Sequence, residues 1–516
     1  MNAIATAPPT GLTHVAQIPA YWARVLPDAV AIWQDDAPIT YAALQRAIET
    51  AASLLRQQGV DVGDRVMIVS ENCVVQIAMM FAATSLGAWP MVANARMTAR
   101  EIDALRALAS PRVTILTTSA STEAVAHASR LDAVAVQAPE PLLQAFAVRV
   151  DRAPREPEPE ELVRDVALLM PTSGSTGVPK GVLVTHRGLL HFCGVSVDAR
   201  RMRCDDVVYG VLPISHIFGV STQLLVTLYA GASLYLEARF TPQRLLLALE
   251  RRAISMLPGV PTLFVRLLAH LREGGVALAP HALRYAYVGG AALELSLKRE
   301  FEARFGCAVH HGYGMTEYAG SMFITRVERP RDDASAGELN DGCEVRIVDA
   351  AGADVRPGEV GEIWIRGAGL MRGYYRAPGL TADAMRPGGW FNTGDLGRLD
   401  EGGALFVRGR SKDMIIRSGF NVYPAEVEAV LNAHVSIQLS AVVGAPAADG
   451  NEDVVAFVQM VPGHALDPAT LRQWLADRLA PYKRPNRWIE LPALPLLANG
   501  KLARRALHQL LVETPT

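Results

Sequence analysis

Apolar runs rich in β-branched residues alternate with helix-type segments through about the first four hundred residues. Segments 241–253 and 294–305 repeat apolar residues at intervals of three and four, the spacing of an amphipathic helix. A repeated strand–helix–strand order is typical of layered α/β architecture with largely parallel sheets. The expected strands are 65–70, 112–118, 166–170, 206–213, 232–238 and 283–290.

The pattern changes near residue 342, where short alternating strands are separated by Gly, Asp and Pro. This change predicts an antiparallel sheet or small β-barrel over about 342–409. After 408-RGRSKD-413 the pattern changes again, to an α+β unit. Because 516 residues exceed one ordinary core, we expect an N-terminal domain over 1–409 and a C-terminal domain over 410–516. The C-terminal elements expected are helices 424–434 and 467–479 and strands 436–446 and 452–460.

One uncharged run, from Cys73 to Val92, is long enough to cross a membrane. It is interrupted by Gln76, Thr84 and Pro90 and follows the strand-like 65-RVMIVS-70, so we expect a buried helix of the core. The N-terminus shows no basic segment followed by an apolar one and does not resemble a signal peptide.

Charge and cysteine usage exclude several classes of partner. Fifty Lys and Arg residues against 52 Asp and Glu give a net charge of −2, and no basic run indicates nucleic-acid binding. The five cysteines are far apart and never in CxxC spacing, which predicts neither a zinc site nor a disulfide framework. A reducing cytoplasm is the expected compartment.

The segment 171-PTSGSTGVPKG-181 is dense in glycine, hydroxyl residues and proline, and we expect a loop rather than a helix or strand. Such a loop can turn backbone N–H groups and hydroxyls toward a phosphate, with a lysine adding charge. It is not a P-loop, because Pro179 stands in the cradle and Lys180 precedes Gly181 instead of Ser or Thr. A flexible connection is the alternative.

Three further motifs carry polar residues beside glycines. Thr316 and Glu317 lie in 311-HGYGMTEYAG-320, where Glu317 could hold a divalent ion and Thr316 a phosphate oxygen. Asp395 lies in 389-GWFNTGDLG-397, which we interpret as a Gly-flanked turn whose carboxylate accepts ribose hydroxyls. Lys501 follows Asn–Gly in 498-ANGKLAR-504. Taken singly, these signals are weak: Asp395 is also an ordinary turn former, and a lone lysine such as Lys501 is nearly always a solvated side chain.

Taken together, the ordered motifs PTSGSTGVPKG, YGMTE, FNTGD, GRSKDMI and NGK resemble the superfamily of adenylate-forming enzymes, with a likeness that runs from about residue 15 to 510. The superfamily holds acyl- and aryl-CoA ligases, luciferases and peptide-synthetase adenylation domains. The resemblance implies two stacked α/β subdomains plus a small β-barrel, joined to a mobile α+β C-terminal domain. It also implies activation of a carboxylic acid by ATP as an acyl-adenylate, followed by transfer to a thiol.

The resemblance implies a role for each matched residue. Lys501 neutralises charge between carboxylate and phosphate, Thr316 bonds the α-phosphate, and Glu317 coordinates Mg²⁺. Asp395 and Arg410 hold the ribose. The β- and γ-phosphates are held by Thr172, Ser173, Gly174, Ser175, Thr176, Gly177 and Lys180, and the adenine by Tyr313 with the backbone of Gly289, Gly290 and Ala291.

The second half-reaction requires a switch in the same family. By resemblance, the C-terminal domain rotates about a hinge at Lys412, within 410–413, and withdraws Lys501. Ser418, Gly419 and Phe420 then lie near the pantetheine arm of CoA. The implied cofactors and substrates are ATP, Mg²⁺, CoA and a small carboxylic acid, in a monomer or homodimer.

The acid itself is less determined. Amino-acid-activating members carry an aspartate in the segment that matches 212–223, and none is present here. His216 matches a position that gates the acyl pocket, with plain packing as the alternative. No Arg or Lys falls in this wall, which argues against a dicarboxylic acid. An apolar wall is expected from His216, Ile217, Phe218 and Val220, with Gly289 and Gly312 leaving room beside it and Tyr318 able to shorten it.

We therefore expect an apolar monocarboxylic acid, with a medium- or long-chain fatty acid favoured over a benzoate-like acid. CoA is the expected acceptor. Two alternatives stay open: an acyl-AMP ligase that loads a separate carrier protein, and a non-catalytic nucleotide sensor.

Overall fold

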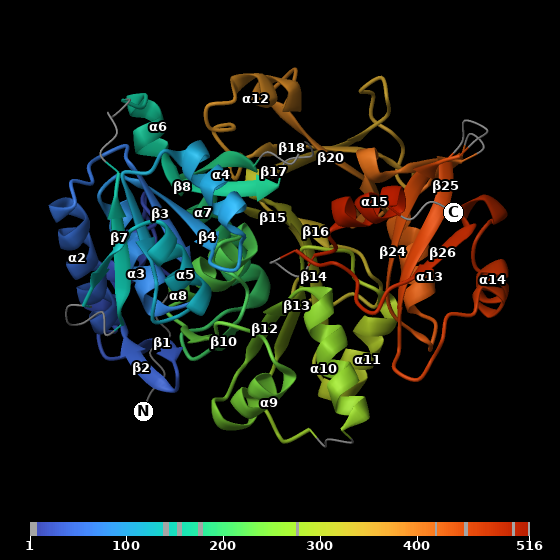
Figure 1. Cartoon of the computed structure of the whole chain (residues 1–516), viewed down its shortest axis with the longest axis horizontal. Helices are drawn as coiled ribbons and strands as arrows, with labels where there is room; N and C mark the ends of the chain where they lie inside the picture. Colours follow the sequence, from blue (N-terminus) through green and yellow to red (C-terminus); the bar gives the residue numbers. More distant parts are fainter. Residues whose placement is uncertain are drawn as a thin grey trace.

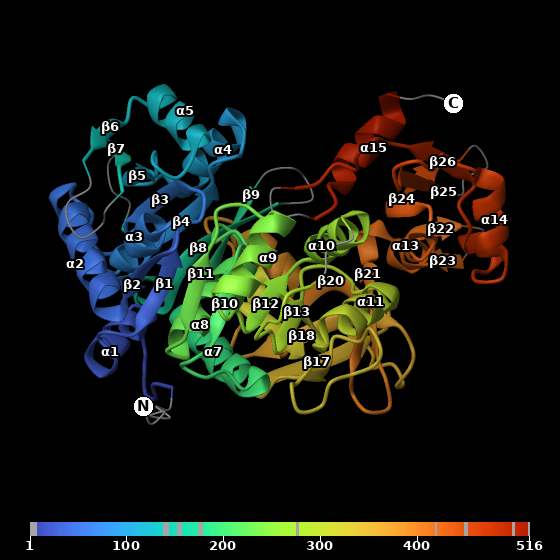
Figure 2. The ribbon, with the colours of Figure 1, turned by 90° about the horizontal axis from the view of Figure 1, so that it is seen from below.

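The computed structural model describes residues 8–137, 144–151, 157–173, 179–274, 278–417, 420–447, 452–497 and 501–513. Two large sheets with their helices form one body, and the C-terminal unit lies at its side (Figure 1). Seen from below, the same C-terminal unit stands apart at one end, with α15 (Arg504–Glu513) reaching back toward the main body (Figure 2).

The first α/β subdomain is built on a five-stranded sheet in the order β4-β3-β5-β7-β6. Strand β3 pairs in parallel with β4 and β5, whereas β7 pairs antiparallel with β5 and β6. The bounds are β3 (Arg65–Ser70), β4 (Trp89–Asn94), β5 (Val113–Leu116), β6 (Val134–Val136) and β7 (Phe146–Val150), with helices α1 (Gln17–Val25), α2 (Tyr41–Gln57), α3 (Val74–Ser85), α4 (Ala99–Ala109), α5 (Thr122–Arg130) and α6 (Glu160–Asp165).

The uncharged run from Cys73 to Val92 forms the buried helix α3 only as far as Ser85, and its last residues, 89–92, belong to strand β4. Residues 74–84 of α3 are all buried, and the helix contacts α2, β3 and β4. A helix that is apolar all round must be covered by protein in this way. None of the helices that the structure describes is long and apolar enough to span a membrane.

The second subdomain holds a nine-stranded sheet in the order β16-β15-β14-β13-β12-β10-β11-β1-β2. Strands β1 and β10 to β14 form its parallel part, while β2, β15 and β16 pair antiparallel at the two edges. The strands are β1 (Val30–Gln34), β2 (Ala37–Thr40), β10 (Val207–Gly210), β11 (Ser233–Leu236), β12 (Met256–Gly259), β13 (Tyr285–Val288), β14 (Val309–Met315), β15 (Gly320–Ile324) and β16 (Glu338–Leu339).

Helical segments connect and cover these strands. The predicted helices 241–253 and 294–305 are found as α9 (Pro242–Arg251) and α11 (Leu295–Phe305). One segment has π-helical hydrogen bonding, η1 (Phe218–Leu225), and runs directly into a short α-helix. The remaining helices are α7 (His186–Arg200), α8 (Val226–Tyr229), α10 (Pro261–Glu273) and the 3₁₀ turn η2 (Thr316–Tyr318).

The glycine-rich segment departs from the expected loop at both ends. Pro171–Ser173 belong to β8 (Val166–Ser173) and Pro179–Gly181 to β9 (Pro179–Thr185), which pair antiparallel as a hairpin with Thr172 opposite Lys180. Pro179 is tolerated because it is the first residue of its strand, where a missing N–H disturbs the ladder least. The tip, Gly174 to Val178, lies outside the described residues.

The region from 343 to 410 forms an antiparallel sheet, as the change of pattern predicts. Asp395 does not occupy a turn, because it pairs with Arg410 inside a ladder of two long strands. The elements are β17 (Cys343–Val348), β18 (Gly361–Gly367), α12 (Pro378–Ala384), β19 (Met385–Arg386), β20 (Trp390–Leu399) and β21 (Leu405–Arg410).

The C-terminal unit has its own core. Its three-stranded sheet runs β24-β25-β26, and buried residues such as Val442 and Phe457 face its helices from either side. The elements are the 3₁₀ turn η3 (Ser411–Asp413), β22 (Ile415–Arg417), β23 (Phe420–Val422), α13 (Pro424–Asn432), β24 (Ile437–Pro446), β25 (Glu452–Met460), α14 (Pro468–Ala476), η4 (Pro481–Lys483) and β26 (Arg487–Glu490).

Candidate active site

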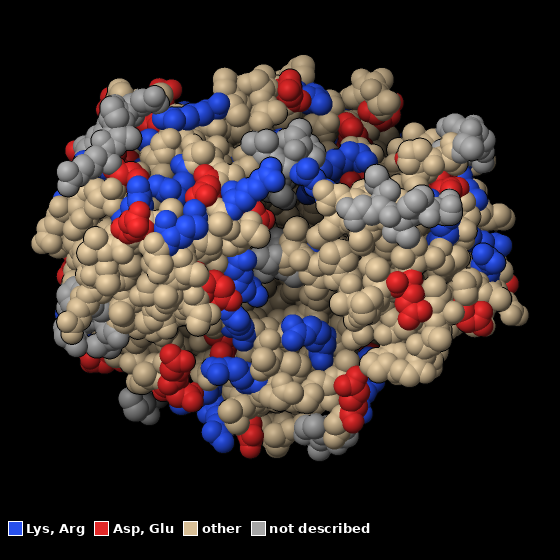
Figure 3. All heavy atoms as spheres, in the orientation of Figure 1, with Lys and Arg blue, Asp and Glu red and all other residues tan. Residues whose placement is uncertain are grey.

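Motif residues that are far apart in the sequence meet beyond the ends of β13 and β14. Strand β13 ends at Val288 and leads into Gly289, whereas β14 leads into Thr316. These two strands are parallel, so the segments that follow them emerge at the same edge of the sheet, where α/β proteins bind ligands. Figure 3 shows a hollow near the middle of this face of the molecule, with Lys and Arg side chains along its rim.

Tyr313, Asp395 and Arg410 form one connected group. The Tyr313 hydroxyl donates to Asp395 Oδ2 at 2.6 Å, and Arg410 Nε lies 3.3 Å from Asp395 Oδ1. Burial raises the pKa of the Asp395 carboxyl, although Arg410 and the Tyr313 hydroxyl act in the opposite direction. The group thus presents a buried carboxylate whose orientation is held from two sides.

Glu317 and Lys180 are linked by Tyr374. Its hydroxyl donates to Glu317 Oε1 at 2.9 Å, and Lys180 Nζ lies 4.7 Å from the centre of its ring. Tyr374 also pairs with Val182 of β9 in an isolated bridge. No motif marks Tyr374 in the sequence, because its role depends on the approach of the segment after β18 to the hairpin.

Lys501 enters the same region from the C-terminal unit. A Cβ built on Gly290, whose φ is +80°, would lie 3.2 Å from Lys501 Cε, so glycine both permits this backbone and leaves room for the lysine. Burial and the charge of Arg410 lower the pKa of Lys501, against the attraction of Asp395 and Glu317. Two cations and two carboxylates therefore face one another across the two units.

A small cavity adjoins Lys501. Burial, with the neighbouring charge of Lys501, lowers the pKa of His216 to about 3, so its imidazole is neutral at physiological pH. His216 Nδ1 accepts a hydrogen bond from the Phe218 N–H at 3.2 Å, which fixes the ring. The cavity is lined by Leu212, Pro213, His216, Phe218, Gly219, Val260 and Lys501.

Three expectations about this cavity are wrong. The space beside Gly289 and Gly312 is filled: added Cβ atoms would lie 2.8 Å from Phe218 Cζ and 2.1 Å from Tyr287 Oη. Tyr318 packs instead beside the segment that leads into β17, where its hydroxyl donates to the Gly342 carbonyl at 3.4 Å. Ile217 and Val220, expected in the wall, are buried in the core and do not line the cavity.

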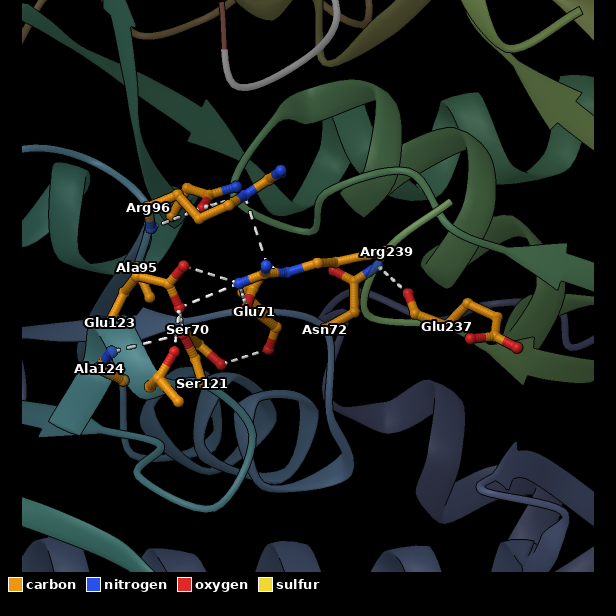
Figure 4. Close-up of polar contacts among 12 residues, drawn as sticks. Ser70, Glu71, Asn72, Ala95, Arg96, Ser121, Glu123, Ala124, Glu237 and Arg239 are labelled. Atoms are coloured by element: carbon orange, nitrogen blue, oxygen red, sulfur yellow. Dashed lines mark hydrogen bonds and ion pairs between the residues drawn. The ribbon is translucent and has the colours of Figure 1, made fainter. Parts of the chain in front are cut away.

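A polar network supports the cavity wall from the first subdomain (Figure 4). Asn72 donates to the carbonyls of Leu212 and Glu237 at 3.0 and 3.1 Å and accepts from the Ile214 N–H at 3.0 Å. Beside it, the buried Glu71 carboxylate receives two hydrogen bonds of 2.8 Å from Arg239. These bonds join the two subdomains and hold the segment that carries His216, although no motif indicated them.

The structure describes some of the remaining predicted residues and leaves others outside the described part of the chain. Phe420 is 54% exposed and stacks on Tyr482, with ring centres 4.5 Å apart, and Lys412 lies in η3 between the two units. Thr316 is buried at the start of η2. Gly174, Ser175, Thr176, Gly177, Ser418 and Gly419 lie outside the described residues.

The residues present fit a magnesium ion that is shared with a phosphate. No group of three metal-ligating side chains occurs in the part of the chain that the structure describes, so a metal cage made by the protein alone is not found there. A single carboxylate, here Glu317, together with substrate phosphates is the usual arrangement for Mg²⁺.

Comparison with known proteins agrees with this geometry. The model of the AMP-binding enzyme family matches residues 20–375, and that of the AMP-binding enzyme C-terminal domain matches residues 426–501. The chain belongs to the AMP-binding enzyme family. It is an AMP-forming acid–thiol ligase, and enzymes of this kind use ATP, Mg²⁺ and CoA.

Individual relatives cover nearly the whole chain. A feruloyl-CoA synthase of an Amycolatopsis species is 34% identical over 94% of this chain and 96% of its own length. An indoleacetate–CoA ligase of Aromatoleum aromaticum is 32% identical, with 94% and 95% covered. The solved structure of ATP-bound MatB from Rhodopseudomonas palustris superposes with a TM-score of 0.80 at 29% identity, with 96% of this chain and 99% of that chain covered.

Proposed function

We propose that this ligase joins a compact aromatic carboxylic acid to CoA by way of an acyl-adenylate. The observation that carries the proposal is the mostly apolar lining of the cavity beside Lys501, to which Leu212, Phe218 and Val260 contribute. The rings of Phe218 and Tyr287 occupy the space beside Gly289 and Gly312, which favours a compact acid. The names of the two relatives, feruloyl-CoA synthase and indoleacetate–CoA ligase, support an aromatic acid over the fatty acid favoured by the sequence.

The chain's own residues supply the electrostatics that this reaction needs, since a carboxylate must approach an α-phosphate that is already negative. We assign charge neutralisation between the two reacting anions to Lys501. Thr316 would bond the α-phosphate, and Glu317 would hold Mg²⁺, which offsets phosphate charge when bound. The neutral His216 would border the carboxylate end of the acid.

The nucleotide would lie on the face opposite the acid cavity. Asp395 and Arg410 would bind the ribose and Tyr313 the adenine, with the backbone of Gly289, Gly290 and Ala291 on the other side. Thr172, Ser173 and Lys180 would contact the terminal phosphates, with the hairpin tip Gly174 to Gly177. Tyr374, which contacts both Glu317 and Lys180, would keep these two side chains apart before the nucleotide binds.

The observed placement of Lys501 suits the first half-reaction. For the second, we propose that the unit beginning at 410 rotates about Lys412 and withdraws Lys501, so that the segment at Phe420 approaches the thiol. We take CoA as the acceptor, a separate carrier protein as the alternative, and a monomer or homodimer as the form in solution. The five free cysteines are compatible with action in the cytoplasm.

Acid-dependent ATP–pyrophosphate exchange, followed by a thioester assay with CoA, tests the function. We expect exchange with benzoate-, cinnamate- or indole-type acids and little with dodecanoate, and then formation of the CoA thioester. Exchange without a CoA thioester would favour carrier loading, whereas no exchange with any acid would refute the ligase function. Preference for dodecanoate would refute the aromatic assignment alone.

A further inference from the structure

A buried arginine lies behind the acid cavity. Arg200, the last residue of α7, is 2% exposed, and among the described residues it forms no ion pair with a carboxylate. Its Nη1 donates to the Thr222 carbonyl at 3.0 Å, while Nε and Nη2 have no hydrogen-bond partner in the described part of the chain. Burying a guanidinium without a carboxylate partner is unfavourable in free energy, so the other contacts of Arg200 must offset part of this desolvation.

Those other contacts are aromatic. The Arg200 Cζ atom lies 4.9 Å from the centre of the Tyr287 ring and 5.9 Å from that of Tyr285. The two rings are stacked, with centres 6.1 Å apart and planes at 9°, and His310 stacks on Tyr285 from the next strand. A cation over aromatic faces in a dry site is attracted more strongly than at a surface.

This column of rings leads directly to the cavity. Tyr287 meets Phe218 edge to face, with ring centres 5.9 Å apart, and Phe218 lines the cavity. The Tyr287 hydroxyl lies 3.0 Å from Ser321 Oγ, which fixes the far end of the ring. From the cavity inward, the order is therefore Phe218, Tyr287 and Arg200.

Arg200 also holds the segment that carries Phe218. Thr222, whose carbonyl accepts the Arg200 hydrogen bond, lies in the same π-helix that begins at Phe218. One guanidinium thus holds both sides of the Phe218–Tyr287 contact: the helix on one side and the ring on the other.

We propose that Arg200 is a positioning residue that sets the depth of the acid cavity, by holding Tyr287 against Phe218. The inference rests on the proposed function, and it assigns the selectivity for compact acids to a residue that does not touch the acid. Without the guanidinium, Tyr287 keeps its contact with Ser321 but loses the cation on its ring face. The π-helix also loses its bond at Thr222, so Phe218 can shift from Tyr287 and open space below the cavity. Longer acids then gain about fourfold in kcat/KM for each methylene they bury there.

The test is the ratio of kcat/KM for biphenyl-4-carboxylate to that for benzoate, measured by ATP–pyrophosphate exchange. Arg200→Met keeps the bulk of the side chain and removes its charge, and we expect the ratio to rise about tenfold or more. Arg200→Lys restores a cation and should bring the ratio back to within about threefold of the parent. A rise in the ratio is not expected from a loss of stability alone, which would lower both rates together.

Arg65→Met is the matched control. Arg65 is also buried and lies over a tyrosine ring, 5.7 Å from the centre of Tyr375, but in the first subdomain. It should lose stability, since it also loses the 3.1 Å ion pair with Glu158, without a change in the ratio. If Arg65→Met raises the ratio as much as Arg200→Met does, the proposal is overturned.

Tyr287 gives a second route should Arg200→Met fail to fold. Tyr287→Leu removes the ring face and should raise the ratio, whereas Tyr287→Phe keeps the face and should leave it unchanged. If the parent is active and both Arg200→Met and Tyr287→Leu show the same kcat/KM ratio as the parent, this inference is refuted and the ligase function is unaffected. A parent with no exchange on any acid would refute both.

Discussion

We expect Glu294 to make the contact between the two units dependent on pH. Its carboxylate, just before α11, accepts a hydrogen bond from Asn432 of α13 in the C-terminal unit. Burial, with a smaller contribution from the charge of Glu428, raises the pKa of Glu294 from an ordinary 4.5 to about 7. Because the raised value favours the protonated carboxyl, the docked arrangement binds a proton that the undocked one releases.

The direction and size of the pH effect on docking follow from the difference between these two pKa values of Glu294. Docking of the C-terminal unit on the main body is unaffected by Glu294 below about pH 4.5 and weakens as pH rises through 7. Above that, the free energy of docking is less favourable by at most about 3 kcal/mol. Between about pH 5.5 and 8.5 the docking equilibrium should fall by up to about 30-fold. Glu294→Gln, which cannot ionise, should remain docked across this range.

Small-angle X-ray scattering follows docking through the radius of gyration. The rate of ATP–pyrophosphate exchange by Glu294→Gln, relative to the parent at each pH, follows its effect on activity. We expect the parent to be more extended at about pH 8.5 than at 5.5 and the variant to be unchanged. Glu300→Gln, on the same helix but paired with Arg272, is the control and should behave as the parent does. A parent that keeps one radius across the range, or a variant that changes as much, would refute the reasoning.

Three further outcomes test the assigned roles. With the two half-reactions measured separately, Lys501→Ala should slow adenylation by about 100-fold or more and leave thioester formation from supplied acyl-adenylate within about threefold of the parent. Lys483→Ala is the control and should not slow adenylation in this way. Equal loss of both steps in Lys501→Ala would contradict the role. Glu317→Gln should raise the Mg²⁺ concentration needed for half-maximal exchange, and an unchanged titration would remove it from the metal site. Tyr313→Phe, which loses its bond to Asp395, should raise KM for ATP about three- to tenfold with little change in kcat, and the opposite pattern would argue against a binding role.

The sequence predicts local structure well where a pattern repeats. Strand β3 begins and ends at the expected residues and helix α3 begins where expected, because alternation and uniform apolarity are properties of neighbouring residues, but α3 ends at Ser85 and the rest of the uncharged run enters β4. The glycine-rich hairpin was expected to be a loop, since composition alone does not reveal that Thr172 and Lys180 pair across it.

Residues whose role depends on distant partners were missed. Arg200, at the end of a helix in the sequence VDARRM, reads as a surface side chain, yet the packing of β13 buries it. Asn72 becomes significant only when Leu212 and Ile214 are brought to it. The space expected beside Gly289 and Gly312 was also wrong, because the absence of a side chain at one position says nothing of which ring from another strand will fill it.

The position of β1 has a consequence for how the protein is made. This strand, formed early in the chain, pairs in parallel with β11, with Ile32 opposite Leu234, and so belongs to the sheet of the second subdomain. During synthesis, β11 emerges from the ribosome some two hundred residues later, and until then β1 can pair only with β2 while its other edge stays open. The two subdomains are therefore not separable by cutting the chain between them, and removal of residues before β3 would expose the edge of β11 to pairing with other molecules.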